Sequence, residues 1–158
     1  MAATKINVSV ASIMTREPVC AEPSMSIRQF ALLLEQNEVS GAPVVDAQGR
    51  VIGVASKSDL IRRCSEGTRD LPPGYLFEVI SDQGGDEEGV IPEPLICVQD
   101  FMSEDVETAR PETPISQVAK QMYDRRIHRV IIVDEEHMPV GIVTSLDVLG
   151  AFPTDRGA

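Results

Sequence analysis

Apolar residues in the first third of the chain form a helical pattern followed by a strand pattern. The helical pattern has the i, i+3, i+4, i+7 spacing of one face of an amphipathic helix, and it consists of Ile27, Phe30, Ala31 and Leu34. Ser26 and Gln29 have the spacing of a capping box at its start. Residues 42–46 and 51–56 then predict two strands joined by a tight polar turn, and a short helix is expected near residues 59–63.

The whole pattern occurs a second time, 88 residues later. When residues 10–61 are laid on residues 98–149 without a gap, 11 of the 52 positions are identical and many others are conservative. The identical pairs include Met14 with Met102, Gly53 with Gly141, and Asp59 with Asp147. We interpret this self-similarity as an internal duplication.

The second copy predicts the same elements as the first. Its helical face consists of Ile115, Val118, Ala119 and Met122. Pro114 fits the first position of this helix, with Thr113 as the cap before it. Strands are expected at residues 129–134 and 140–144, and a last short helix is expected near residues 147–151.

A short extended piece precedes the main helix of each copy, at residues 19–21 and 107–109. Each copy therefore reads β-α-β-β-α. A unit of that size leaves one face of its sheet exposed and is marginally stable alone, so we expect the two copies to pack sheet against sheet. The predicted fold class is α+β, with pseudo-twofold symmetry and a cleft between the two halves.

The repeat divides the chain into three segments, which are repeat 1 at 8–64, a connection at 65–95 and repeat 2 at 96–152. The connection holds Pro-containing turns, a Gly-rich acidic run at 83–89 and a short apolar stretch at 75–80. We interpret it as a linker, and the alternative is a lid or a loop that docks a partner.

The charge of the chain excludes two classes of partner. The formal net charge is −11, and residues 65–95 alone carry eight acidic residues and one basic residue. Nucleic acids and anionic membranes need a basic surface, which this composition does not provide. No apolar run approaches the roughly 20 residues of a membrane helix. The N-terminus lacks the pattern of a signal peptide, and three cysteines at unrelated spacings (Cys20, Cys64 and Cys97) indicate a reduced, cytoplasmic protein.

Each copy closes with the pattern G-h-h-[ST]-x-x-D, where h is apolar, at the end of a strand and the start of a helix. The residues are Gly53, Ser56 and Asp59 in repeat 1 and Gly141, Thr144 and Asp147 in repeat 2. Backbone N–H groups at a helix start suit a phosphate, and a neighbouring carboxylate suits a pair of ribose hydroxyls. Helix capping by the hydroxyl residue is the alternative reading of the same spacing.

Each copy resembles the CBS domain, named after cystathionine beta-synthase. The resemblance rests on the M-[TS] start, the I-x-x-[FV]-A helix, the hairpin and the final [ST]-x-x-D motif. The resemblance covers residues 10–64 and 96–152. Two such domains in tandem form a Bateman module. The resemblance implies a regulatory module that binds adenine nucleotides, or in some members S-adenosylmethionine, in the cleft between its copies. Such modules also commonly pair into a disc-shaped dimer.

Carried over residue by residue, the resemblance implies a first pocket in which Asp147 holds the ribose and Thr144 a phosphate oxygen. The other expected residues of this pocket are Thr15, Val19, Cys20, His128, Arg129, Val140 and Ile142. The pair His128-Arg129 resembles a His-Arg pair that faces phosphates in the gamma subunit of AMP-activated kinase. The alternative for the basic residues at 125–129 is a solvated helix end.

In the second implied pocket, Asp59 and Ser56 take the same roles. Its other expected residues are Ser40, Gly41, Val54, Lys57, Ser103, Glu107 and Thr108. Glu107 places a carboxylate where the first pocket has the neutral Val19, and a carboxylate repels phosphate. We therefore predict that the Asp147 pocket binds a nucleotide more tightly than the Asp59 pocket.

These features predict a regulatory module that binds AMP, ADP or ATP, has no cofactor, forms a homodimer and signals to an unknown regulated protein. The rival hypotheses are a ligand-free dimerisation scaffold and a binder of S-adenosylmethionine. An enzyme is not expected, because no catalytic triad, metal-ligand spacing or phosphate-binding glycine loop is present. His137 falls in a hairpin turn, where a surface role is expected.

Overall fold

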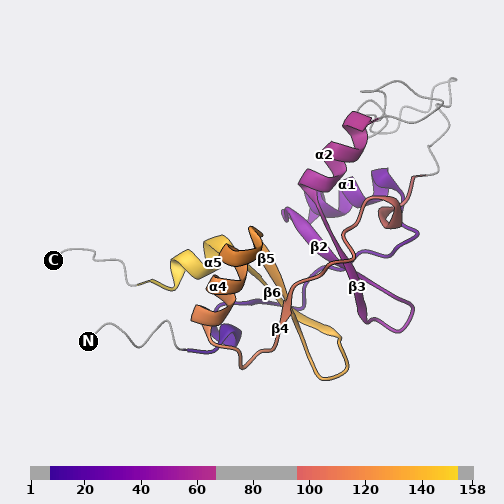
Figure 1. The fold of residues 1–158 in the computed structure, drawn as a ribbon. Helices are drawn as coiled ribbons and strands as arrows, with labels where there is room; N and C mark the ends of the chain where they lie inside the picture. The colour runs from indigo at the N-terminus through magenta and orange to yellow at the C-terminus, as the bar shows by residue number, and fades with distance from the viewer. Residues whose placement is uncertain (1–7, 67–95, 153–158) are drawn as a thin grey trace, which may run out of the picture. The chain divides into compact units, whose positions relative to one another are not determined.

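The computed structural model describes residues 8–66 and 96–152 (Figure 1). In repeat 1 the elements are η2 (Val10–Ser12), β1 (Thr15–Arg16), α1 (Ile27–Gln36), β2 (Gly41–Val45), β3 (Val51–Ser56) and α2 (Lys57–Glu66). In repeat 2 they are η3 (Val98–Asp100), β4 (Thr108–Ala109), α4 (Ile115–Arg125), β5 (Arg129–Val133), β6 (Pro139–Thr144) and α5 (Ser145–Gly150). The α+β class and the repeated β-α-β-β-α pattern are confirmed. Most of the predicted linker lies outside the described residues, and its first two residues end α2.

The chain forms two compact units, and each unit joins most of one repeat to the opening segment of the other. Unit 1 consists of Met1–Pro18, Ala47–Val51 and Asp105–Ala158, and unit 2 consists of Val19–Asp46 and Ile52–Glu104. The opening segment of repeat 1, which ends at Pro18, thus belongs with the sheet of repeat 2. The opening segment of repeat 2, which ends at Glu104, belongs with the hairpin of repeat 1. The sequence pattern alone assigns each opening segment to its own repeat, so this exchange is a finding of the structure.

Unit 1 is built on a four-stranded sheet in the order β1-β6-β5-β4. β1 pairs with β6 in antiparallel register, with Thr15 opposite Ile142, and β4 pairs with β5 in parallel register. One face of the sheet packs on α4 and α5. The fully or nearly fully buried residues of this core include Val10, Ile115, Val118, Val130, Ile132 and Val143. Val10 is contributed by the exchanged opening segment, so this segment completes the core.

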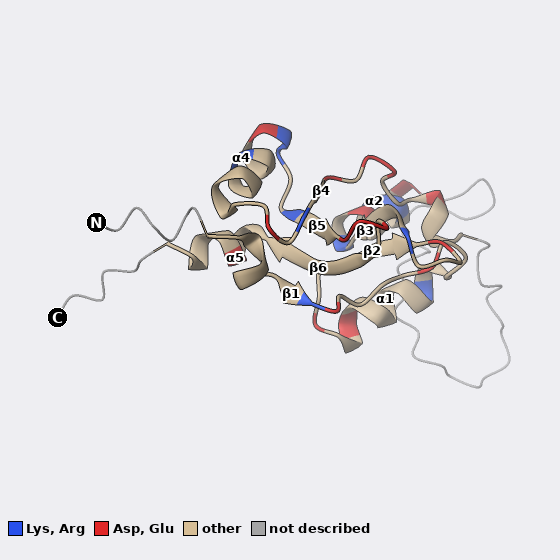
Figure 2. Ribbon diagram, turned by 90° about the horizontal axis from the view of Figure 1, so that it is seen from below, with Lys and Arg blue, Asp and Glu red and all other residues tan. Residues whose placement is uncertain are grey.

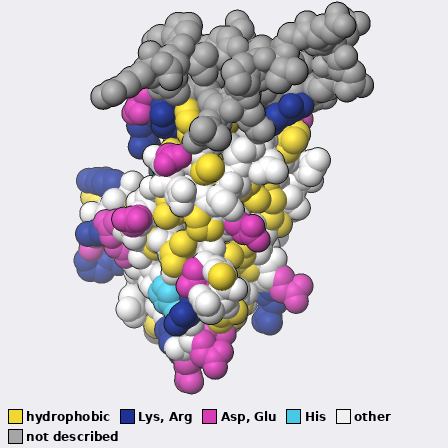
Figure 3. Space-filling model, turned by 90° about the vertical axis from the view of Figure 1, so that its right-hand side faces the viewer, with side chains coloured by type: hydrophobic (Ala, Val, Ile, Leu, Met, Phe, Trp, Pro, Cys, Tyr) yellow, Lys and Arg dark blue, Asp and Glu magenta, His cyan; other side chains and the backbone are white. Residues whose placement is uncertain are grey.

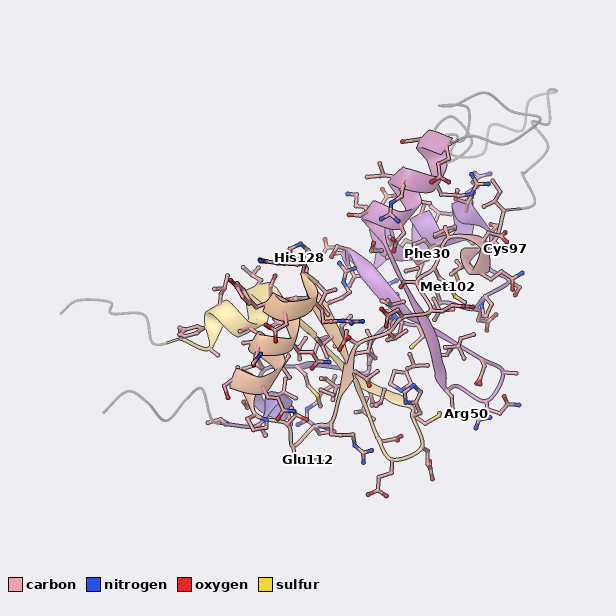
Figure 4. All side chains as sticks on the ribbon, viewed as in Figure 1. Phe30, Arg50, Cys97, Met102, Glu112 and His128 are labelled. Atoms are coloured by element: carbon pink, nitrogen blue, oxygen red, sulfur yellow. The ribbon has the colours of Figure 1, made fainter. Side chains whose placement is uncertain are left out.

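Unit 2 contains the two-stranded sheet β2-β3 with α1 and α2. Its opening segment from repeat 2 is joined to β3 through two backbone hydrogen bonds of 2.9 Å between Val54 and Ser103. The Phe30 ring packs against Phe101 from this segment, with 5.6 Å between the ring centroids. Figure 4 labels Phe30 of α1, together with Cys97 and Met102 of the opening segment of repeat 2. The buried core includes Ile27, Phe30, Val44, Ala55, Leu60 and Val98.

The exchange explains why Met and Gly are identical at two positions of the repeat. Met102 covers Gly53, where an added Cβ would lie 2.7 Å from the Met102 sulfur and 3.1 Å from the Ser103 carbonyl oxygen. Met14 covers Gly141 in the same way, with 2.9 Å between the built Cβ and the Met14 Cγ. Each opening segment therefore approaches its strand so closely that a residue larger than glycine would displace the methionine side chain.

Two local predictions are wrong. Residues 19–21 form no strand, and only an isolated parallel bridge joins Ala21 to Val44. Pro114 is the N-cap of α4 rather than its first residue, because its ψ of 143° is still extended. The Thr113 hydroxyl oxygen instead accepts a hydrogen bond from the Arg110 backbone N–H, at 3.0 Å. By contrast, the capping box of Ser26 and Gln29 is confirmed.

Candidate functional site

The two [ST]-x-x-D motifs form reciprocal capping boxes. At the start of α5, the Thr144 hydroxyl oxygen accepts from the Asp147 N–H at 3.2 Å, and Asp147 Oδ2 accepts from the Thr144 N–H at 2.9 Å. At the start of α2, Asp59 Oδ2 accepts from both the N–H and the hydroxyl of Ser56, each at 2.8 Å. The capping reading of these motifs is therefore confirmed, and it fixes each carboxylate in one orientation.

The second carboxylate oxygen distinguishes the two motifs. Asp59 Oδ1 accepts from the Arg62 guanidinium at 3.3 Å, one turn further along α2. The repeat places Gly150 at the position equivalent to Arg62, so α5 has no side chain there. Within the part of the chain that the structure describes, Asp147 Oδ1 has no hydrogen-bond or ion-pair partner. Asp147 is thus held by the cap and still has an acceptor oxygen for a ligand.

Arg129 lies directly across the sheet from Thr144, since the two residues are Cα partners in the β5-β6 ladder. Directly opposite residues in an antiparallel pair point to the same face. Thr15, Ile142 and Ile131 form the next row of that face. The buried core side chains of these strands alternate to the other face. The face opposite the helices therefore brings together Arg129, Thr144, Ile142 and Thr15 of the predicted first pocket.

Of the nine residues predicted for the first pocket, seven belong to unit 1. The exceptions, Val19 and Cys20, belong to unit 2. Seven of the nine predicted for the second pocket belong to unit 2, and Glu107 and Thr108 belong to unit 1. Matching backbone bonds fix the loop before the strand in each repeat. The Ser145 N–H donates to the His128 carbonyl, and the Lys57 N–H donates to the Ser40 carbonyl, both at 2.8 Å.

The CBS domain family model matches residues 10–66 and 98–154, which is most of the chain. The chain belongs to the CBS domain family. Its two CBS domains form a pair, and solved structures of CBS domain pairs have the same fold.

This CBS pair matches one curated relative over nearly its whole length and two longer relatives over only a part of theirs. It is 28% identical over 149 residues to uncharacterized protein MJ1426 of Methanocaldococcus jannaschii, and the match covers 87% of each chain. It spans only 23% of two longer curated relatives. The structure of CBSX2 from Arabidopsis thaliana in complex with AMP is 25% identical, with a TM-score of 0.67 and coverage of 91% and 95%. The CBS domain pair of MJ0100 in complex with 5-methylthioadenosine and S-adenosyl-L-methionine is 24% identical, with a TM-score of 0.69 and coverage of 91% and 94%.

An ion-pair cluster in CBS repeat 2 changes the electrostatic argument for the second pocket. Arg125 donates to Glu107 and to Asp105, with N–O distances of 2.7 Å in both cases. The Glu107 carboxylate is therefore compensated, and its expected repulsion of phosphate is weaker than the sequence implies. Arg125 is in turn engaged by two carboxylates. The sequence gives no signal for this cluster, because residues 105–107 and 125 share no helical spacing.

The described residues of the CBS pair show neither a continuous basic surface nor a membrane-spanning helix, as the composition predicts. Basic residues lie among acidic ones along the ribbon of Figure 2, and the described residues on the face drawn in Figure 3 form no continuous basic surface. Among the helices that could be searched, none is long and apolar enough to cross a bilayer. The search of the same residues found no group of three His, Cys, Asp or Glu side chains placed to hold a metal ion.

Burial disfavours the thiolate form of two cysteines in CBS repeat 1. Burial raises the pKa of Cys20 above its ordinary value. Burial also raises the pKa of Cys64, although the nearby Arg63 charge opposes the shift. Because the thiolate is the nucleophile, both groups should be weak nucleophiles at neutral pH.

We predict that iodoacetamide labels Cys20 more slowly in the native protein than in urea, with the midpoint of its pH profile shifted upward. Peptide mass spectrometry across pH 7–10 measures both. The same shifts predict that the free energy of unfolding falls as pH rises above the ordinary thiol pKa of about 8.5, because the unfolded thiols ionise first. A native midpoint equal to or below the urea midpoint would contradict the assigned desolvation.

Proposed function

We propose that this CBS pair is a cytoplasmic, homodimeric regulatory module that binds an adenine nucleotide, AMP or ATP, and signals its binding to a partner protein. The observation that carries the proposal is the state of Asp147. Its carboxylate is oriented by the capping box, one oxygen has no partner among the described residues, and Arg129 lies across the strands from its capping partner Thr144. A fixed carboxylate oxygen suits ribose hydroxyls, and a guanidinium suits phosphate.

The likeness to CBSX2 supports this ligand class, since that CBS-pair structure contains AMP. Ile142, two residues before Thr144 on the same strand, provides a partly buried apolar side chain against which an adenine ring could pack, whereas Val140 packs against the core of unit 1. The same arrangement recurs at Asp59 with one difference, because Arg62 already occupies its second oxygen. We therefore propose that the Asp147 site binds more tightly than the Asp59 site, which agrees with the ranking predicted from the sequence but rests on a different contact.

Regulation follows if the nucleotide has different affinities for two conformations of the module. The module itself would then perform no reaction, and a partner protein would respond to the conformational change. Two other functions compete with nucleotide sensing. One is a scaffold with empty sites, and the other is binding of S-adenosylmethionine.

A thermal-shift comparison separates these functions. At about 100 times its dissociation constant, a ligand adds about 2.7 kcal/mol to the free energy of unfolding. We expect AMP or ATP to raise the melting temperature and guanosine monophosphate, the matched control, to leave it unchanged. A shift with S-adenosylmethionine alone would support the second rival, and no shift with any of these ligands would support the scaffold.

A further inference from the structure

The turn between β2 and β3 is docked on the turn between β5 and β6. Residues 47–51 belong to unit 1, although β2 and the rest of β3 belong to unit 2. Within unit 1, the N–H group of the buried Val51 donates to the His137 carbonyl at 3.0 Å. Gly49 lies against the Met138 side chain, since a Cβ added to Gly49 would lie 2.7 Å from the Met138 Cε. We call these two interactions the turn contact.

The side chain of Asp134 holds the β5-β6 turn in shape. Its Oδ1 atom accepts from the N–H groups of Glu136 and Met138, both at 2.9 Å. The Asp134 N–H donates to the Met138 carbonyl at 3.0 Å, and the Asp134 carbonyl accepts from the His137 N–H at 3.1 Å. The acceptor of the turn contact is therefore held in place by bonds that do not involve Val51.

The two turns are equivalent in the repeat, but the contact between them is one-sided. Gly49 and His137 are 88 residues apart, and both have left-handed φ values, of 83° and 64°. In the same way, Val51 has Pro139 as its equivalent. Because proline has no N–H group, Pro139 cannot donate a matching hydrogen bond to the Gly49 carbonyl. The hydrogen bonding of the turn contact therefore depends on the single donor of Val51.

The turn contact joins the starts of the two strands that lead to the candidate sites. β3 begins at Val51 and ends at Ser56, which the capping box ties to Asp59. β6 begins directly after the β5-β6 turn and ends at Thr144, which the other capping box ties to Asp147. Hydrogen-bonded strands are rigid elements that can carry energetic coupling between distant sites. The two aspartates are thus connected through β6, the turn contact and β3.

We propose that the turn contact couples the two candidate nucleotide sites, so that AMP bound at Asp147 stabilises β3 and the Asp59 motif at its end. This inference rests on the proposed function and adds a regulatory step within one chain. A ligand at Asp147 orders β6 and the turn that Val51 contacts. A second ligand at Asp59 then loses less conformational entropy, so the two sites bind cooperatively. Coupling through a single hydrogen bond corresponds to a factor of about two to ten in affinity, and the Asp147 site still fills first.

Hydrogen exchange of the β3 amides, measured by NMR on the full chain, tests this coupling. At an AMP concentration that fills only the Asp147 site, we expect exchange to slow by about threefold or more in both β6 and β3. Val51→Pro deletes the donor and copies the residue that repeat 2 carries at the start of β6, where a proline fits. In this variant AMP should slow exchange in β6 alone. Val51→Ala, the matched control, shortens the same side chain but keeps the N–H group, and it should respond as the wild type does.

Met138→Ala removes the other half of the turn contact, which is the side chain that packs on Gly49. It leaves the β2-β3 hairpin unchanged in sequence, so it keeps the test decisive if Val51→Pro does not fold. We expect the response of β3 to AMP to become smaller in this variant. β3 amides that do not respond to AMP in the wild type, or that respond fully in both Val51→Pro and Met138→Ala, would overturn the coupling.

A comparison without ligand separates this inference from the nucleotide proposal. Asp147→Ala breaks the capping box at the end of β6. We expect it to speed exchange in β3 by about twofold or more in the wild-type background and to leave β3 unchanged in the Val51→Pro background. If AMP slows exchange in neither strand, the nucleotide proposal fails and this comparison decides the coupling. Unchanged β3 exchange in the single variant Asp147→Ala would overturn it.

Discussion

Replacing Asp147 by Asn is expected to weaken AMP binding by about 10- to 100-fold, which corresponds to the loss of hydrogen bonds to a charged group. The substitution separates the two roles of this side chain. The amide oxygen of the new side chain still accepts from the Thr144 N–H, so the capping box and α5 persist. The other acceptor oxygen becomes an NH₂ group, which cannot accept from ribose hydroxyls. Calorimetric titration with AMP, together with a thermal melt of the free protein, measures both effects.

The matched variant is Asp59→Asn, which makes the same chemical change in repeat 1. The Arg62 guanidinium already occupies Asp59 Oδ1, so we expect a smaller loss of nucleotide affinity. A larger loss from Asp59→Asn than from Asp147→Asn would reverse the proposed ranking of the two sites. A drop in melting temperature with Asp147→Asn alone would show that the residue acts through the cap instead.

Val10→Asp is expected to destabilise unit 1 by about 4 kcal/mol or more, since it buries an unpaired charge. Val10 is fully buried, and its neighbours in the core come from repeat 2, although Val10 itself belongs to repeat 1. Hydrogen exchange should therefore lose protection in α4, β5 and β6. The first repeat's own α1, β2 and β3 should keep their protection at low denaturant, because they belong to unit 2.

Val98→Asp provides the reciprocal control. Val98 occupies the equivalent position in repeat 2 and is fully buried in the core with Ile27 and Phe30. It should expose α1 and β2 to exchange and spare α4. Loss of protection in the repeat that carries the substitution, in either variant, would contradict the exchange of opening segments.

The local elements were predictable because each depends on neighbouring residues. Apolar spacing predicts the boundaries of the four hairpin strands to within one residue, as in 51–56, which is observed as Val51–Ser56. The last helix of each repeat is longer than, or displaced from, its predicted range, because α2 and α5 begin directly after the capping residue. The Pro114 position was missed for a similar reason, since a proline fits both the cap and the first turn of a helix.

The exchange of opening segments could not be read from the sequence. The opening segments of both repeats carry the same pattern, including Met14 and Met102, so either could complete either unit. The register of β1 on β6 and the bridge of Ser103 to Val54 show that each opening segment pairs with the other repeat and not with its own. Likewise, the motif spacing identifies Asp59 and Asp147 as equivalents. The spacing does not show that the Arg62 side chain pairs with Asp59, or that Asp147 has no such partner because Gly150 stands at the equivalent position.

Native mass spectrometry of the full chain with AMP tests the central proposal most directly, because it counts the ligands bound to each chain. We predict a peak shifted by one AMP per chain at low ligand concentration, and a second shift only at higher concentration, when the Asp59 site fills. Asp147→Asn should remove the first shift and leave the protein folded. A wild-type spectrum with no bound AMP at millimolar concentration, or with the same occupancy by guanosine monophosphate, would contradict adenine nucleotide recognition.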